Sequence, residues 1–335
     1  MRRLDDIIRA VQEHGSTLRV AIAPCAERFV LRAALDAARL GLAQPVFIGN
    51  RERSCAAAQT LCPNFADFEF IDCDDDDEAV HKAVELYRAG RAQLIMKGLV
   101  STSTLLKAVL AKDAGLVTPG GIMSLVSVFD APPQAVEADS EAMGAMGAMD
   151  TMGVARATGV DQAPRLMLLT DAGVNIRPNL QRKMDILKNA IGVARALGIT
   201  RPRAAVLAAT EKVNFPAMPA TLDADLLSKM ATDGVFGDAL VAGPLALDLA
   251  VSPTSARLKG VDNPVAGHAD ILLAPDIESG NILHKAIGML LGAPIASVVV
   301  GSKAPVVVPS RGDSERSKLA SIALAVFLAQ QGGAA

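Results

Sequence analysis

The residue types best suited to chemistry stand near the end of the chain, where the apolar residues 306–308 are followed by Pro309-Ser310-Arg311-Gly312-Asp313. The sequence predicts that Ser310 opens the last long helix. Amides at a helix start, joined by a guanidinium, suit a phosphate or a developing oxyanion. Ser310 and Arg311 are therefore candidates for an anion site, and the hydroxyl of Ser310 would donate to the same anion.

Helix capping is the alternative interpretation of this motif. A serine N-cap with Asp313 at the third helical position resembles a capping box, although Glu or Gln is preferred there. Capping does not explain Arg311, because a cation in the first helical turn opposes the helix dipole.

A second anion candidate follows another apolar run. Lys97 stands at the end of LIMK, and Thr102 and Ser103 stand at the start of the next predicted helix. Alternatively, Thr102 or Ser103 only caps this helix and Lys97 is solvated. Ser127, in the run IMSLVSVFD, either faces the same crevice or is an ordinary strand position.

The elements that must position these residues are short apolar runs that end abruptly in polar residues. They are LRVAIAPCAER, PVFIGNRE, LIMKGLVSTST, RLMLLTDAGVN, AAVLAATEKVN, ALVAGPLALD, DILLAPDIESGN and APVVVPSRGDS. Such runs are typical of buried parallel strands, and helical patterns alternate with them. The order predicts an α/β fold with a mainly parallel sheet and ligands beyond the carboxyl ends of the strands.

Composition and motifs exclude several classes of function. The net charge of −3 provides no basic field for nucleic acid or anionic lipid. No apolar run approaches the roughly 18 residues needed to span a bilayer. The four cysteines form no CxxC pair and no paired histidines stand at ligand spacing, so we expect free thiols, no metal site and a cytoplasmic protein. Neither GxxxxGK[ST] nor a well-placed GxGxxG is present.

Together the polar strand ends resemble the phosphate acetyltransferase and phosphate butyryltransferase family, and the forms STSTLLK and SRGDS are closest to the butyryl branch. The matching stretches occur in family order between about residues 90 and 330. They are MKGLVSTSTLLKAVL, LLTDAGVN, PRAAVLAATEKVN, GPLALDLAVS, AGHADILLAPDIESGNILHKAIG and PVVVPSRGDSERSKLASIALA.

The resemblance implies reversible transfer of a short acyl group, butyryl or similar, between CoA and inorganic phosphate by direct thiol attack in a ternary complex. It implies no tightly bound cofactor, with CoA and acyl-CoA as substrates, and a homodimer. The implied fold is a two-lobed, three-layer α/β/α architecture, isocitrate/isopropylmalate dehydrogenase-like, with a cleft between lobes. Residues 1–130 plus 300–335 would form the first lobe and 165–299 the second. Residues 131–164, rich in Met, Gly and Ala, would be an insert or connector. This segment would be either a loose surface helix or mobile loop, or a lid over the cleft or partner-binding face.

Site residues follow from the same resemblance. Arg311 would bind phosphate and Ser310 would stabilise the tetrahedral oxyanion. Acetyl-type enzymes have an Asp base seven residues after that Ser, where this chain has Ser317, so Asp313 and Glu315 are the nearby candidates and Asp313 completes the catalytic set. Expected substrate- and phosphate-binding residues are Lys97, Thr102, Ser127, Lys107, Asn281 and Lys285.

Three other functions remain as alternatives. One is a phosphate acetyltransferase proper. Another is an NAD- and metal-dependent decarboxylating dehydrogenase of the same fold, for which Asp171, Asp248 and Asp276 are available. The third is a non-catalytic sensor of CoA or phosphate.

Overall fold

The computed structural model describes residues 1–118, 120–131, 164–310 and 312–332. In these ranges the strands are β1 Leu18–Ala23, β2 Ala43–Gly49, β3 Phe70–Asp72, β4 Leu94–Lys97, β5 Ser124–Asp130, β6 Leu166–Thr170, β7 Arg203–Leu207, β8 Leu240–Leu245, β9 Ile271–Leu273, β10 Ile295–Val300 and β11 Val306–Val307. The principal helices are α1 Leu4–His14, α2 Arg28–Arg39, α3 Arg51–Ala58, α4 Asp76–Arg88, α5 Thr102–Leu110, α7 Leu180–Ala196, α8 Pro219–Thr232, α9 Leu247–Val251, α10 Pro253–Leu258, α11 Ile277–Lys285 and α12 Glu315–Gln330.

All these strands join one sheet in the order β3-β2-β1-β4-β11-β10-β5-β6-β9-β7-β8. Consecutive strand residues pack into opposite cores: Ala21 and Ile95 belong to one apolar cluster, whereas their neighbours Ile22 and Met96 belong to the other. Both faces of the sheet are therefore covered, which confirms the predicted layering and explains why the strands read as unbroken apolar runs.

Strand direction changes in the middle of the sheet. β5 is antiparallel to β6 and to β10, and β11 is antiparallel to β10 but parallel to β4. The strands therefore form two groups of opposite direction. One group contains β3, β2, β1, β4, β11 and β5, and the other contains β10, β6, β9, β7 and β8. The polar strand ends therefore do not share one edge of the sheet, because the carboxyl ends of the two groups lie at opposite edges.

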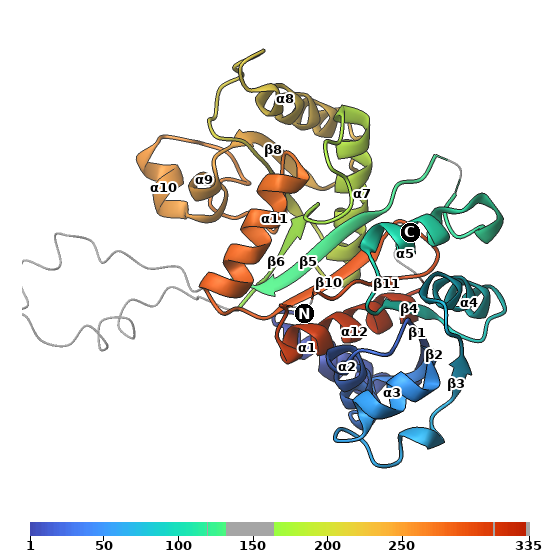
Figure 1. The fold of residues 1–335 in the computed structure, drawn as a ribbon. Helices are drawn as coiled ribbons and strands as arrows, with labels where there is room; N and C mark the ends of the chain where they lie inside the picture. Colours follow the sequence, from blue (N-terminus) through green and yellow to red (C-terminus); the bar gives the residue numbers. More distant parts are fainter. Residues whose placement is uncertain (119, 132–163, 311, 333–335) are drawn as a thin grey trace, which may run out of the picture.

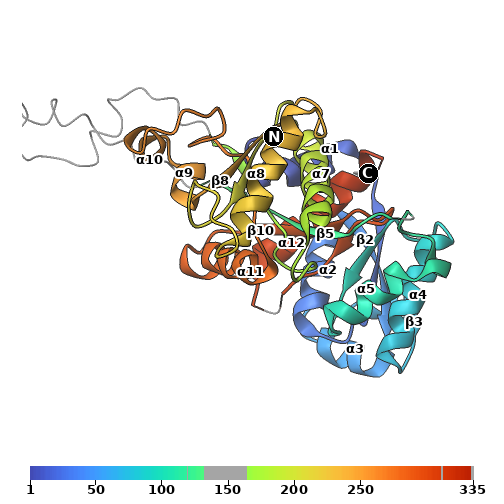
Figure 2. The same ribbon diagram turned by 90° about the horizontal axis from the view of Figure 1, so that it is seen from above.

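The C-terminal segment lies between the two ends of the sheet. In Figure 1 and Figure 2 the early elements gather at one end and the green-to-gold elements at the other, with the red α12 between them. β11 pairs with β4, and α12 packs on β10, α1 and α2. The division into lobes at residues 1–130 plus 300–335 and 165–299 stays a prediction, and the proposed connector falls almost wholly outside the described residues.

Local signals explain where several helices begin. Asp75 caps α4 by accepting the backbone N–H of Glu78, and Asp76, Asp77 and Glu78 form the acidic first turn of this helix, where carboxylates favour the helix dipole. Within the described ranges, no helix combines the length and apolar character that crossing a bilayer requires.

Candidate active site

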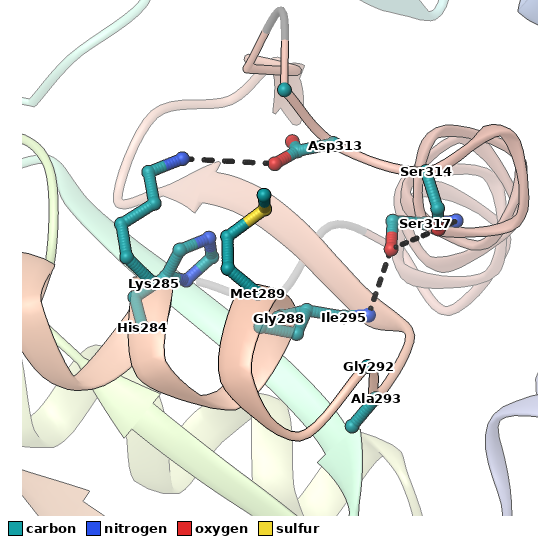
Figure 3. Close-up of a pocket in the computed structure, with 11 residues that line it drawn as sticks. His284, Lys285, Gly288, Met289, Gly292, Ala293, Ile295, Asp313, Ser314 and Ser317 are labelled. Carbon is teal, nitrogen blue, oxygen red and sulfur yellow. Dashed lines mark hydrogen bonds and ion pairs between the residues drawn. The ribbon is translucent and has the colours of Figure 1, made fainter.

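A small pocket of about 210 Å³ lies between the end of α11 and the segment that leads into α12. One wall is polar and the other is built from small or apolar residues. The lining residues are His284, Lys285, Gly288, Met289, Gly292, Ala293, Ile295, Gly312, Asp313, Ser314 and Ser317 (Figure 3). α11 continues here as a π turn over Ala286–Leu290. Such turns are rare and recur at functional sites.

Two of the predicted site residues, Lys285 and Asp313, line this pocket, and a third, Ser310, is hydrogen-bonded to Lys285. The ammonium of Lys285 donates a hydrogen bond of 3.0 Å to the Ser310 hydroxyl and lies 3.8 Å from a carboxylate oxygen of Asp313. Since an ammonium only donates, Ser310 must accept, and its own O–H is left to donate elsewhere. The arrangement presents a cation and a hydroxyl donor side by side, which suits an anionic oxygen.

The turn at Ser310 differs from the predicted helix start. The Ser310 N–H donates to the Asp313 carboxylate at 2.7 Å, and the Asp313 N–H donates to the Ser310 carbonyl at 3.1 Å. α12 begins only at Glu315, and Ser314 caps it by accepting the Ser317 N–H. The prediction that Ser310 opens this helix is therefore wrong, and the helix dipole does not bear directly on Ser310. Ser314 is the N-cap of α12, so the interpretation of Ser310 as the N-cap is wrong as well.

Arg311, the predicted phosphate ligand, lies outside the described residues, as do residues 132–163. Their predicted roles rest on the sequence.

A buried polar chain stands behind the pocket. Ser127 Oγ lies 3.1 Å from His284 Nδ1 and 3.1 Å from Ser297 Oγ. Ser127 is fully buried, so the structure places it behind His284 rather than on the pocket wall. Burial lowers the pKa of His284, the nearby Lys285 lowers it further, and Asp313 opposes the change. His284, which is not among the predicted site residues, is therefore a neutral imidazole on the pocket wall at neutral pH.

Glu315, a candidate for the base, and Ser317, which stands at the position of the expected Asp, both have structural partners. Glu315 forms an ion pair with Arg32 and does not line the pocket. Ser317 lines it, but its hydroxyl accepts the Ile295 N–H at 3.1 Å and bonds Ser314 at 2.9 Å. Ser317 thus fastens the start of β10 to α12.

The second anion candidate lies on β4 and α5. Lys97 donates to the carbonyls of Gly98 and Val100 at 3.1 and 2.9 Å, which ties it to its own loop. Ser101 caps α5, so neither Thr102 nor Ser103 does, and Thr102 is the first helical residue. Lys107 is exposed on the same helix. None of these residues lines the pocket at α11.

Asn281 and Gly280 bind α11 to β6. Asn281 donates to the Ala172 carbonyl at 3.1 Å. A Cβ added at Gly280 would come within 2.5 Å of the Asp171 carbonyl oxygen. The glycine therefore permits close packing of α11 against the segment that follows β6.

The acids suggested for a dehydrogenase each have a structural partner. Asp171 accepts the backbone N–H groups of residues 173–175, Asp248 pairs with Lys259, and Asp276 caps α11. Across the described part of the chain, no three His, Cys, Asp or Glu side chains are grouped to hold a metal ion.

Comparison with known proteins identifies the family. The model of the family described as phosphate acetyl/butaryl transferase matches residues 4–326. The chain belongs to this family. It is 39% identical to a phosphate butyryltransferase of Clostridium acetobutylicum, over 93% of each chain. It is 36% identical to a phosphate acetyltransferase of Thermotoga maritima, over 94% of this chain and 96% of the relative.

Solved structures agree with the fold. A branched-chain phosphotransacylase from Enterococcus faecalis V583 superposes with a TM-score of 0.74 at 30% identity, covering 93% of this chain and 99% of that chain. A 4-hydroxythreonine-4-phosphate dehydrogenase from Klebsiella pneumoniae superposes with a TM-score of 0.50 at 15% identity, covering 94% of this chain and 100% of that chain. The second likeness concerns architecture alone, and it agrees with the expected dehydrogenase-like fold.

Proposed function

We propose that this protein is a phosphate acyltransferase that reversibly transfers a short acyl group, butyryl or similar, between CoA and inorganic phosphate. The observation that carries the proposal is the cluster of Lys285, Ser310 and Asp313, of which Lys285 and Asp313 line the pocket, in a chain that belongs to this family along nearly its whole length. CoA and acyl-CoA are substrates in this mechanism, and no tightly bound cofactor takes part.

The geometry gives each residue of the cluster a task. Lys285 holds the Ser310 oxygen as an acceptor, so the Ser310 hydroxyl hydrogen is available to the oxyanion that forms when the acyl carbon becomes tetrahedral. The Lys285 ammonium places a positive charge beside the phosphate and the oxyanion. Asp313 holds the Ser310 backbone in its turn. Arg311 supplies the guanidinium for phosphate, on the strength of the sequence motif. We retain Lys97, Thr102, Lys107 and Asn281 as more distant contacts to the substrates.

The small wall of the pocket supports a short acyl chain. Gly288, Gly292, Ala293 and Ile295 leave room for a few methylene groups beside the polar wall. A Cβ at Gly288 would sit 3.5 Å from the Ile295 side chain, so a larger residue there would fill the space. Each methylene accommodated in such a pocket is worth about 1–3 kcal/mol in substrate discrimination.

Release of CoA from acetyl-, propionyl-, butyryl- and isobutyryl-CoA, with and without phosphate, tests the proposal. We expect phosphate-dependent release, fastest with a four-carbon acyl group. Preference for acetyl-CoA would instead support a phosphate acetyltransferase proper. Tight CoA binding without any turnover would identify a sensor and would refute the enzyme.

Arg311→Ala tests the phosphate ligand. The expected result is a large rise in the KM for phosphate with little change in the urea midpoint of unfolding. Loss of folding in this variant would show that Arg311 acts structurally instead.

We also propose that the enzyme is a cytoplasmic homodimer. The four cysteines are unpaired, which supports a reducing compartment. Ile282, Met289, Leu290 and Leu291 expose large apolar side chains along α11 and its π turn, with Leu290 83% exposed. A second copy of the chain would cover them. Light scattering should give a dimer for the parent chain and a monomer for Leu290→Asp.

A further inference from the structure

The reaction needs a group that takes the proton of the CoA thiol. Asp313, Glu315 and Ser317 do not supply it. A thiol is a far weaker nucleophile than its thiolate. Ser317 stands where acetyl-type relatives were expected to have an Asp, and its hydroxyl is engaged with Ile295 and Ser314. Glu315 is paired with Arg32 away from the pocket. One oxygen of Asp313 accepts the Ser310 N–H, and the other faces Lys285.

His284 is differently placed. It lines the pocket, is only 8% exposed, and is followed in the chain by Lys285. Figure 3 shows its ring on the same wall of the pocket as the Lys285 and Met289 side chains. Nδ1 is fixed by Ser127 at 3.1 Å. Among the described residues, only Arg19 has a fully buried side-chain nitrogen without a hydrogen-bond partner. The Nε2 of His284, which bonds no described residue, is therefore open to solvent in the pocket.

The buried serines behind His284 can fix its tautomer. Ser127 Oγ lies 3.1 Å from Ser297 Oγ as well as from His284, and both serines are buried. When Ser127 donates to Ser297, it accepts from an Nδ1–H of His284. The single proton of the neutral ring is then on Nδ1, and Nε2 carries a lone pair facing the pocket.

We propose that His284 is the general base for the CoA thiol, a role that rests on the proposed acyltransferase function. Nε2 takes the thiol proton while sulfur attacks the acyl carbon of the acyl phosphate. The new S–C bond forms, the C–O bond to phosphate breaks, and the imidazolium passes the proton to the departing phosphate. In the opposite direction, Nε2 takes the proton of the attacking phosphate and returns it to the leaving thiolate. Ser127 is a positioning residue, because it acts through His284.

The electrostatic surroundings agree with this role. Burial keeps the pKa of His284 below its ordinary value, Lys285 acts in the same direction, and Asp313 acts against both. Among the described residues, Lys285 on α11 and Asp313 in the segment before α12 are the charged groups that act on the ring. The imidazole is accordingly unprotonated near neutral pH, and the ammonium of Lys285 favours the thiolate that results.

His284→Asn provides the decisive variant, because its amide takes the place of Nδ1 beside Ser127 and no group takes the place of Nε2. The measurement is kcat for formation of acyl-CoA from butyryl phosphate and CoA between about pH 6 and pH 9.5. Loss of a general base costs about 10²- to 10⁴-fold, so we expect a fall of at least about 100-fold near pH 7. The deficit should shrink above about pH 8.5, where the thiol ionises without help. The control is His81→Asn, on the exposed surface of α4, which should match the parent chain throughout.

Two results for a folded His284→Asn variant would overturn the proposal. An unchanged kcat, or a loss of equal size at all pH values, would show that His284 is structural. Absence of phosphate-dependent turnover in the parent chain would refute the proposed acyltransferase function. The proposed role of His284 would then be refuted as well. If His284→Asn does not fold, the pH dependence of kcat in the parent chain tests the proposal instead. A rate nearly level from pH 7 to 8.5 supports a neutral imidazole base, whereas a rise of about tenfold per pH unit means that the thiol ionises unaided.

Discussion

Replacing Ser310 by Ala tests the most specific part of the proposed mechanism. The change removes one hydroxyl and leaves the backbone of the 310–313 turn intact, because the Ser310 N–H that binds Asp313 belongs to the main chain. Removal of one oxyanion donor from other enzymes costs about 2.7–4 kcal/mol, or roughly 10²- to 10³-fold in kcat. We expect a loss in that range with little change in KM, since the bond to the oxyanion exists only in the transition state.

The stability of Ser310→Ala should be almost unchanged. Lys285 loses an acceptor, but its side chain is 41% exposed and water can replace the hydroxyl. The free energy of unfolding, measured in urea, should stay within about 0.5 kcal/mol of the parent value. Ser314→Ala should behave in the opposite way, because Ser314 caps α12 and loss of a cap costs about 0.5–2 kcal/mol.

Kinetic assays of phosphate-dependent CoA release decide the matter. Ser310→Thr keeps a hydroxyl and should retain most of the activity that Ser310→Ala loses. A fall in kcat of less than about threefold for Ser310→Ala would refute the oxyanion role, since even a weak donor in a water-poor site contributes more than that. A loss of stability equal to that of Ser314→Ala would show that the hydroxyl serves the fold.

Other perturbations test neighbouring features of the site and fold. Gly288→Val should lower kcat/KM for butyryl-CoA relative to acetyl-CoA by about tenfold or more, because it fills the acyl end of the pocket; equal losses for both substrates would contradict this. Ser317→Ala should lower the free energy of unfolding by about 1–3 kcal/mol, since it leaves the buried N–H of Ile295 unpaired. Gly280→Ala should cost about 1–3 kcal/mol, because its Cβ would press on a β6-end carbonyl, and a neutral result in urea would show that α11 can shift. Exposed Cys55 should react quickly with a thiol reagent, whereas Cys25, whose pKa burial raises to about 11, should react only after unfolding.

Several features could be predicted because they depend on neighbours in the chain. Ala21 and Ile22 are both apolar because a central strand has no solvent face, so the strand run is visible in the sequence. The acidic start of α4 is equally local. The hydrogen bond between Lys285 and Ser310 could not be predicted from the sequence. Both are predicted site residues, yet nothing in their spacing shows that the ammonium of Lys285 reaches the hydroxyl of Ser310.

The start of α12 could not be predicted, because its local motif fits two serines. Ser310 and Ser314 are both serines followed three residues later by a polar side chain, and the sequence cannot say which of them caps α12. In the structure the Asp313 carboxylate accepts the Ser310 N–H, and α12 begins only at Glu315, with Ser314 as its N-cap.

The sequence by itself determined the alternation of buried strands and helices, the family, and the residue types that we propose for binding phosphate. Those depend on patterns of neighbouring residues and on chemistry that each side chain carries alone. Only the tertiary structure decided that the strands form two groups of opposite direction, and that His284 stands between a pocket and two buried serines. Ser127, His284 and Ser297 come together through strand pairing and helix packing over more than a hundred residues, and no local spacing specifies such contacts.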